Sequence, residues 1–254
     1  MTTTHERREE IVRLTTSEGT ATVGELAHHF GVTPSTIRRD LAVLGARGRI
    51  ARTYGGALGV VAHPESSLAQ RMVEAAEEKR AIARWVASQI RPGESILLDA
   101  GSTVAAVAQE LRSARGIRVA CVGLTSLDQL ADVDGIELDC LGGRVRPLSR
   151  SLIGPLTEAS LERMTFDRAF LGADGVNARE GICEADLEQT RLKELMARRA
   201  GRVYVLAHGA KLGTRPFHAW APLPLPWTLV TDASATPSAV GEFAAAGVDV
   251  VVAG

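Results

Sequence analysis

Three short segments near the start of the chain carry apolar residues at helical spacing. The first covers residues 6–17, and the second begins after Thr22, which can cap it. The third begins after Thr33, a second capping residue, with Pro34 at its first position, where a missing N–H costs nothing. The pattern predicts three amphipathic helices, with apolar faces made of Ile11, Leu14, Val23, Leu26, Ala27, Phe30, Ile37, Leu41 and Leu44.

The side of the third segment that faces away from its apolar stripe carries small and cationic residues. At about 100° per residue, that side and its flanks hold Ser35, Thr36, Arg38, Arg39, Ala42 and Ala46. Arginine can contact a guanine edge or a phosphate through two N–H groups, and Ser or Thr can bond to either. The pattern fits a helix in the DNA major groove. It fits equally well a small helical bundle with a solvated arginine face.

A short ribbon after the third segment favours the first interpretation. Gly48 ends the helix, and residues 49–56 are predicted to be extended and closed by two glycines. On this ribbon Arg52 and Tyr54 would reach a backbone phosphate or the minor groove. A helix-turn-helix followed by such a ribbon is a winged arrangement.

Apolar strands alternate with helical stretches in the rest of the chain. Residues 59–75 have no clean period and include Pro64, so they are predicted to link a domain of residues 1–58 to one of residues 76–254. The alternation predicts an α/β domain with a mostly parallel sheet and helices on both faces. The strand candidates are 95–99, 118–122, 137–141, 168–171, 203–207, 228–231 and 249–252.

The loop after the first of these strands has the chemistry of a phosphate cradle. Ligands of parallel sheets bind at the carboxyl ends of the strands. Here Asp99 is followed by Gly101, Ser102 and Thr103, and a helix begins at once. Backbone N–H groups at a helix start favour an anion, and the hydroxyls add donors. The simpler alternative is that Ser102 or Thr103 only caps its own helix.

Three further strands end in glycine-bearing loops, and together the four loops predict one polar pocket. Asp99 and Asp174 are expected to bind hydroxyl groups in it. Ser102, Thr103, Arg144 and Lys211 are expected to bind an anion. That profile suits a phosphorylated sugar. No sequence pattern for a nucleotide-binding loop, a hydrolase nucleophile or a zinc protease is present.

Composition and charge narrow the class of protein. With 45% hydrophobic and 23% charged residues and no long apolar run, the chain is expected to be a globular, cytoplasmic protein without a membrane partner. Cys121, Cys140 and Cys183 are far apart, which argues against a metal site or a disulfide framework. The net charge is −1 overall, but residues 1–60 carry eight arginines against six acidic residues. That asymmetry is consistent with nucleic acid at the N-terminus.

Lysine is rare in this chain. Among its 29 basic residues, the lysines are Lys79, Lys193 and Lys211. A lysine kept in an arginine-rich background can be one whose ammonium is specifically needed. Lys79 is nevertheless expected on a helix surface or at a contact between domains. For Lys193, a ligand contact and a solvated side chain are both open.

Several motifs together resemble the DeoR family of bacterial transcription regulators. The most specific are Thr36-Ile-Arg-Arg-Asp-Leu41 and Gly55-Gly-Ala57 in the first domain. In the second domain the resemblance rests on 78–83, 98–103, 141–143, 154–155, 169–175, Lys193 and 210–213. It covers nearly the whole chain.

The resemblance implies a winged helix-turn-helix repressor with a sheet related to that of ribose-5-phosphate isomerase, used to sense a sugar phosphate. Asp40 would be a structural partner of an arginine. The expected partners are double-stranded DNA and a second copy of the chain, since winged helices usually read paired half-sites. The expected DNA contacts are Thr22, Thr33, Ser35, Thr36, Arg38, Arg39, Arg52 and Tyr54. The expected effector contacts are Asp99, Gly101, Ser102, Thr103, Gly142, Gly143, Arg144, Gly172, Asp174, Gly175, Lys193, His208 and Lys211.

Two departures from the family pattern leave the identity of the effector open. Thr125 stands where the family tends to have an amide, and His208 stands where it usually has a carboxylate. A second hypothesis is a sugar-phosphate isomerase with an appended helical domain, for which Asp174 and Lys211 would be the catalytic pair. The winged helix argues against it, because an isomerase does not require one. We therefore expect no catalytic residues, cofactor or metal.

Overall fold

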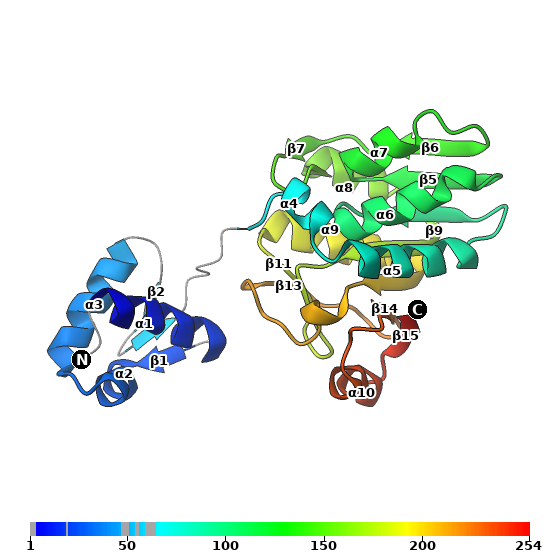
Figure 1. The fold of residues 1–254 in the computed structure, drawn as a ribbon. Helices are drawn as coiled ribbons and strands as arrows, with labels where there is room; N and C mark the ends of the chain where they lie inside the picture. The colour runs from blue at the N-terminus through cyan, green and yellow to red at the C-terminus, as the bar shows by residue number, and fades with distance from the viewer. Residues whose placement is uncertain (1–3, 19, 47–50, 54–55, 59–64) are drawn as a thin grey trace. The chain divides into compact units, whose positions relative to one another are not determined.

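The computed structural model describes residues 4–18, 20–46, 51–53, 56–58 and 65–254 (Figure 1). The chain forms two compact units, residues 1–64 and 65–254. The second unit begins ahead of residue 76, where the sequence pattern placed its start. Residues 68–73 form the short helix α4, and the Leu68 N–H donates to Leu148 O of the second unit across 2.9 Å.

The first unit is a winged helix-turn-helix. Its helices share a core that includes Ile11, Leu26, Ile37, Leu41 and Leu44, as the apolar pattern predicted. Three short strands form an antiparallel sheet in the order β1-β3-β2. The elements are α1 (Thr4–Glu18), β1 (Thr20–Thr22), α2 (Val23–Phe30), α3 (Pro34–Ala46), β2 (Ala51–Thr53) and β3 (Gly56–Leu58).

The two helix starts in this unit follow from local chemistry. The Thr22 hydroxyl accepts from the Glu25 N–H, and the Glu25 carboxylate accepts from the Thr22 N–H, which is a complete capping box. The Thr33 hydroxyl accepts from the Thr36 N–H at the start of α3. Both predicted caps are therefore confirmed as caps. Gly31 has a φ of +61° and makes the tight turn between α2 and α3.

The second unit is built on a seven-stranded sheet in the order β15-β14-β12-β9-β4-β5-β6, with every pair parallel. Each strand coincides with one of the seven predicted segments to within a few residues, so the α/β prediction is confirmed. The strands are β4 (Ser95–Leu98), β5 (Ile117–Cys121), β6 (Ile136–Cys140), β9 (Phe166–Gly172), β12 (Ala200–Leu206), β14 (Thr228–Asp232) and β15 (Asp249–Ala253).

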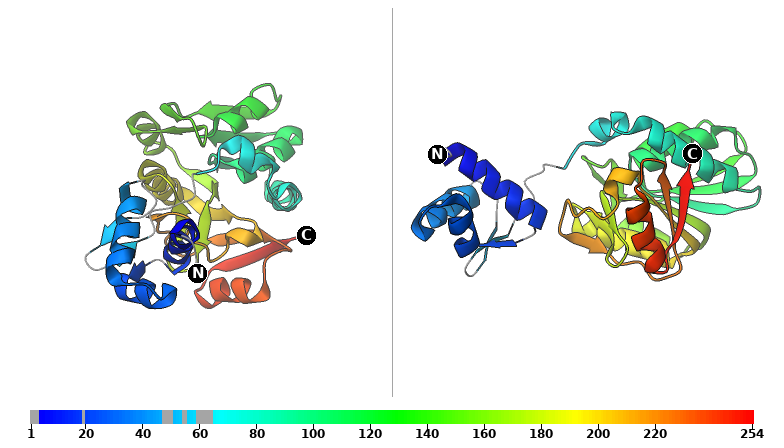
Figure 2. Two further views of the ribbon diagram at one scale, coloured as in Figure 1. Left: turned by 60° about the vertical axis from the view of Figure 1, so that its left-hand side comes forward. Right: turned by 60° about the horizontal axis from the view of Figure 1, so that its bottom comes forward.

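Helices cover both faces of this sheet (Figure 1, Figure 2). Successive strand residues point to opposite faces, so Ile96 and Leu98 pack with α5, α6 and α7, whereas Leu97 packs with α8, α9 and α10. Two cores result, one on each face. The helices are α5 (Ala76–Gln89), α6 (Ser102–Glu110), α7 (Leu124–Leu130), α8 (Pro155–Leu161), α9 (Leu187–Arg198) and α10 (Pro237–Ala245). In the described part of the chain, no helix is long and apolar enough to cross a bilayer.

Several short elements surround the sheet and were not predicted. A hairpin joins β7 (Arg144–Arg146) to β8 (Ser151–Ile153). A small antiparallel sheet contains β10 (Gly175–Asn177), β11 (Gly181–Glu184) and β13 (Ala219–Ala221). The 3-10 turns η1 (Leu111–Ser113) and η2 (Gly209–Lys211) follow α6 and β12. They contribute Ser149, Glu184 and Lys211 to the wall of the cavity described below.

Candidate functional sites

The outer face of α3 presents the residues that the sequence pattern assigned to DNA. Ser35, Arg38 and Arg39 are exposed, and Thr36 is half-buried. No ion pair among the described residues involves Arg38 or Arg39, so both guanidinium groups are available to a phosphate or a base edge. A helix that displays two unpaired arginines beside small hydroxyls is chemically suited to the major groove.

Asp40 anchors this helix to α1. Its side chain is buried and accepts from Arg7 Nε at 2.8 Å and from Arg8 Nε at 2.7 Å, one arginine on each oxygen. With both oxygens occupied, Asp40 has a structural role, as predicted. It fixes the rotation of α3 and thereby the direction in which Arg38 and Arg39 point.

The remaining predicted DNA contacts divide into two groups. The Thr22 and Thr33 hydroxyls serve their own helix starts, and Thr33 Oγ1 also lies 2.8 Å from Ser35 Oγ. Arg52 belongs to β2 by its backbone. Tyr54 lies outside the described residues. The contacts expected of Arg52 and Tyr54 stay predictions.

A cavity in the second unit lies where the strand order changes direction. From β4 the chain continues to β5 and β6 on one side, and later to β9, β12 and β14 on the other. The loops after β4 and β9 diverge at this switch point, which is the general binding position in parallel α/β sheets. The cavity is lined there by Gly101, Ser102, Thr103, Gly172 and Ala173.

The amino end of α6 opens into the cavity without a side-chain cap. Its first residue outside the helix is Gly101, and no side chain of the described chain caps it. The alternative that Ser102 or Thr103 caps α6 is therefore not observed. The first N–H groups of a helix lack intrahelical acceptors, so this end offers backbone donors and the positive end of the helix dipole to an anion.

Lys193 of α9 is the centre of a buried charge network. Its Nζ donates to Asp99 Oδ2 and to Gly172 O at 2.9 Å, and it lies 3.0 Å from Glu184 Oε1. Burial alone would lower its pKa, but the two carboxylates outweigh burial and raise it. An ammonium has three N–H donors, and protein oxygens surround all three. Lys193 therefore lines the cavity and holds Asp99, Gly172 and Glu184 in place around it.

Glu184 is buried at the end of β11. Burial raises its pKa to about 8; Lys193 opposes that shift, whereas Asp174 and Asp99 add to it. Burial therefore favours the neutral acid at this position.

Further cationic side chains lie at the cavity or close to it. Lys211 Nζ donates to Ala173 O and makes no second hydrogen bond in the described structure. Burial lowers its pKa; Asp174 opposes this shift and Arg71 adds to it. Burial, together with Lys211, lowers the pKa of Lys79 to about 8. The pKa of His208 is lowered by burial, and then by Lys211 and Lys79.

All three lysines of the chain thus meet at one place. Lys193 and Lys211 line the cavity, and the buried Lys79 lies directly behind Arg71, to whose carbonyl oxygen it donates. The expectation that Lys79 lies on a helix surface was wrong. The rarity of lysine was a usable signal in the sequence, because each of the three ammonium groups has a specific buried environment.

Some predicted effector residues lie elsewhere or have other partners. Arg144 is exposed and pairs with Glu188. A Cβ on Gly143 would lie 2.1 Å from Thr157 Oγ1, so this glycine lets the loop after β6 pack on α8, where the Thr157 hydroxyl donates to Gly142 O. Gly142, Gly143 and Arg144 do not line the cavity, which means that three of the four glycine-bearing loops converge on it and the fourth does not.

Asp174, Gly175 and His208 lie behind the cavity wall. Asp174 accepts from Arg71 Nη1 at 2.7 Å. A Cβ on Gly175 would lie 2.6 Å from Thr214 O, so this glycine allows two loops to approach closely. His208 is buried, and its Nε2 has no hydrogen-bond partner among the described residues.

Four polar residues that line the cavity were not predicted from the sequence, namely Arg71, Ser149, Glu184 and Gln189. Arg71 belongs to a segment without periodicity. Glu184 ends an apolar strand, Gly181-Ile-Cys-Glu184, and an acidic residue at that position is a signal that could have been used. No group of His, Cys, Asp and Glu in the described chain has the arrangement of a metal site.

Comparison with known proteins matches both units to family models. Residues 7–60 match the DeoR-like helix-turn-helix domain, and residues 74–233 match the DeoR C terminal sensor domain. The transcriptional regulator GlpR of Haloferax volcanii is 34% identical over 97% of this chain and 96% of its own length. The putative aga operon transcriptional repressor of Escherichia coli O157:H7 is 31% identical over 86% of this chain and 82% of its own.

Structural likeness to solved proteins is weaker. Ribose 5-phosphate isomerase A from Neisseria gonorrhoeae aligns with a TM-score of 0.40 and 18% identity, over 54% of this chain and 53% of that one. A variant of the decarboxylase AibA/AibB aligns with a TM-score of 0.44 and 17% identity, over 69% of this chain and 88% of that one. Likeness at this level says nothing about activity. The two family models and the relatives matched over most of their length place the chain in the DeoR family of transcription regulators.

Proposed function

We propose that this regulator is a repressor that binds operator DNA through α3, and that a phosphorylated sugar or related metabolite binds the second unit and releases it from DNA. The release is a linkage: a ligand that prefers the form with low DNA affinity shifts the population toward it. In this proposal the second unit senses its ligand and does not convert it.

The observation that carries the ligand class is the charge around the cavity. Arg71, Lys193 and Lys211 line the cavity and Lys79 lies behind Arg71, whereas burial favours the neutral acid at Glu184. This concentration of cations suits the charge of about −2 on a phosphate monoester. The uncapped start of α6 and the Ser102 and Thr103 hydroxyls add donors for the same group.

The DNA contacts proposed are Ser35, Thr36, Arg38 and Arg39 on α3, with Arg52 and Tyr54 on the ribbon. The relatives whose names include the word repressor include the aga operon repressor and the lactose phosphotransferase system repressor of Streptococcus mutans, which is 29% identical over 89% of this chain. The second name refers to a system for the sugar lactose, which supports a ligand derived from a sugar. A homo-oligomer on paired half-sites completes the proposal.

The DNA half is tested with an operator selected from a random double-stranded library by the full chain. Arg39→Ala is expected to lower affinity for the selected sequence at least tenfold, while Arg84→Ala, which removes an exposed arginine from α5, leaves it unchanged. Equal operator affinity of Arg39→Ala and the wild type would contradict the assignment of α3.

The ligand half is tested by calorimetric titration of the full chain with pentoses and hexoses, each phosphorylated and unphosphorylated, while the mixture is assayed for isomerised product. Binding of a phosphorylated member without turnover supports the sensor. Turnover would favour the isomerase alternative, and the absence of binding by every member would contradict a sugar-phosphate ligand.

A further inference from the structure

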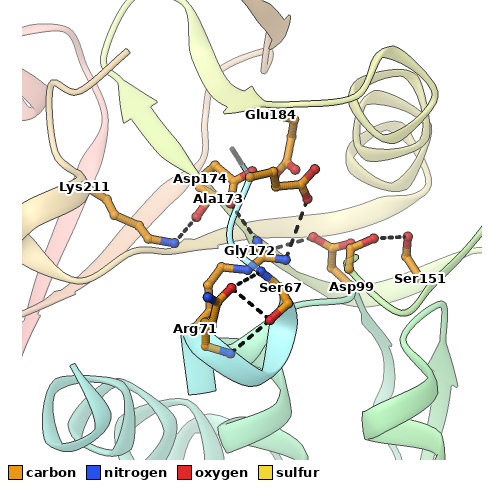
Figure 3. A network of polar contacts seen from close by, with 12 residues as sticks. Ser67, Arg71, Asp99, Ser151, Gly172, Ala173, Asp174, Glu184 and Lys211 are labelled. Atoms are coloured by element: carbon orange, nitrogen blue, oxygen red, sulfur yellow. Dashed lines mark hydrogen bonds and ion pairs between the residues drawn. The ribbon is translucent and has the colours of Figure 1, made fainter. Parts of the chain in front are cut away.

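One part of the cavity wall is α4 (Leu68–Val73). This helix directly follows the chain that links the two units. Its Arg71 side chain lines the cavity next to Lys193 and Lys211. Figure 3 shows Arg71 facing the strand ends that carry Asp99, Gly172 and Asp174.

The guanidinium group of Arg71 is only partly satisfied. Nη1 donates to Asp174 Oδ1 at 2.7 Å, and the nearest other carboxylate oxygen, on Glu65, is 3.9 Å from Nη2. Nε and Nη2 are shielded from solvent and have no hydrogen-bond partner in the described chain. Buried donors without acceptors are costly. A phosphate oxygen in the cavity would satisfy them in the paired geometry that arginine provides.

The cavity is nearly closed in this structure. Its open volume is about 20 Å³, enough for about one water molecule, so a sugar phosphate enters only if part of the wall moves. Lys193 and Gly172 are fixed in the buried network behind α9 and β9. The wall that can move at least cost is therefore the one with the fewest buried contacts.

That wall is α4. Leu68 is its one buried residue, whereas Met72 and Val73 are exposed. Polar contacts hold the helix: Glu65 pairs with Arg146, and Lys79 Nζ donates to the carbonyl oxygens of Arg71 and Glu74. The chain turns into α5 at Ala75, which has a φ of +49°, a left-handed conformation that costs an L-residue free energy.

We infer that Arg71 binds the anionic group of the ligand directly, and that α4 is the element through which ligand binding acts on the chain joining the two units. This inference rests on the proposed function. The ligand must draw Arg71 away from Asp174 or share it, and either change repositions α4 relative to the sheet. Because α4 is continuous with the linking chain, the position of the helix then differs between the free and the ligand-bound protein.

The test compares Arg71→Gln with the matched control Arg80→Gln in the full chain. Arg80 is exposed on α5 and pairs at 2.5 Å with the exposed Glu77. The probes are the sugar phosphate bound by the wild type and inorganic phosphate. We expect Arg71→Gln to weaken binding of both at least tenfold, about 1.4 kcal/mol, and to raise the sugar phosphate concentration for half-release of operator by the same factor. Arg80→Gln should behave as the wild type in ligand binding and in operator release.

Arg71→Lys separates a direct contact from a structural one. Lysine keeps the charge but cannot donate two parallel N–H bonds. The affinity of Arg71→Lys for both probes should therefore fall between those of the wild type and Arg71→Gln. If Arg71→Gln fails to fold, the affinity of Arg71→Lys is the deciding measurement. Unchanged affinity in the Arg71 variants would overturn the inference while the proposed function stands. A gain in affinity would overturn it too, because it would show that Arg71 competes with the anion. Absence of any ligand for the wild type would instead overturn the proposed function.

Discussion

Arg7 Nε donates to Asp40 Oδ2 across 2.8 Å, and this contact ties α1 to α3. Arg8 occupies the other oxygen of the same carboxylate. An arrangement in which two arginines hold one aspartate leaves little freedom for α3 to rotate about its axis. The orientation of the DNA-facing arginines therefore depends on a residue that itself faces away from DNA.

Asp40→Ala should weaken the first unit and DNA binding together. It leaves two partly buried guanidinium groups without their carboxylate, at a cost of about 2 kcal/mol, since both are near enough to solvent to be partly rehydrated. Hydrogen exchange of the α3 amides measures this loss. Arg39→Ala is the control, because it should reduce operator affinity without faster exchange. Hydrogen exchange as slow in Asp40→Ala as in the wild type would show that the ion pairs of Asp40 do not stabilise α3.

Replacing either of the two cavity lysines, Lys193 or Lys211, with methionine should have a different effect on stability and on ligand affinity. Lys193→Met leaves Asp99 buried without its counter-ion, and the free energy of unfolding should fall by about 3–5 kcal/mol. Lys211→Met removes one hydrogen bond to a backbone carbonyl and should cost about 1 kcal/mol, but it should reduce affinity for a phosphorylated ligand at least tenfold. Urea unfolding and calorimetry measure the pair. Equal effects of the two variants on the free energy of unfolding would mean that the charge network around Lys193 does not stabilise the site.

Glu184 gives the stability a pH dependence of known sign. Its pKa is about 8 when folded and ordinarily 4.5, so the folded state holds a proton that the unfolded state has released. The stabilisation is complete below pH 4.5 and is lost as the pH rises to about 8. Glu184→Gln keeps the shape of the neutral acid and cannot ionise. The stability of the wild type minus that of Glu184→Gln should therefore fall between these pH values.

Urea unfolding of both proteins across that range measures this difference, in which the other titrating groups cancel. If the stability difference between the wild type and Glu184→Gln is constant over this range, Glu184 is ionised in the folded protein. If the difference grows with pH, Glu184 is also ionised in the folded protein, and Lys193 stabilises the anion.

The parts of the fold that local chemistry determines could be predicted from the sequence. Thr22 and Thr33 start their helices through hydrogen bonds to residues three positions along, and the strands of the parallel sheet are continuous apolar runs because both of their faces are buried. The short antiparallel elements, such as the β7–β8 hairpin, could not be predicted. Their residues pair with partners fixed by tertiary contacts, and three-residue strands carry no period.

Likewise, only some residues of the candidate site could be predicted from the sequence. Ser102 and Thr103 could be placed because they directly follow a predicted strand, and the carboxyl ends of parallel strands share one edge. Arg71 could not, because it reaches the cavity from a helix far away in the sequence, and only the folded chain brings it to Asp174. Arg144 lies outside the cavity, where its exposed side chain pairs with Glu188, and its sequence position after a glycine pair does not show this.

The central claim is that one chain couples DNA binding to a phosphorylated ligand. The most direct test is fluorescence anisotropy of the selected operator bound by the full chain, titrated in parallel with the phosphorylated and unphosphorylated form of each sugar. We predict that one phosphorylated sugar lowers operator affinity and that its unphosphorylated form does not. Operator affinity that is unaffected by every phosphorylated sugar, or lowered equally by the unphosphorylated form, would contradict the account.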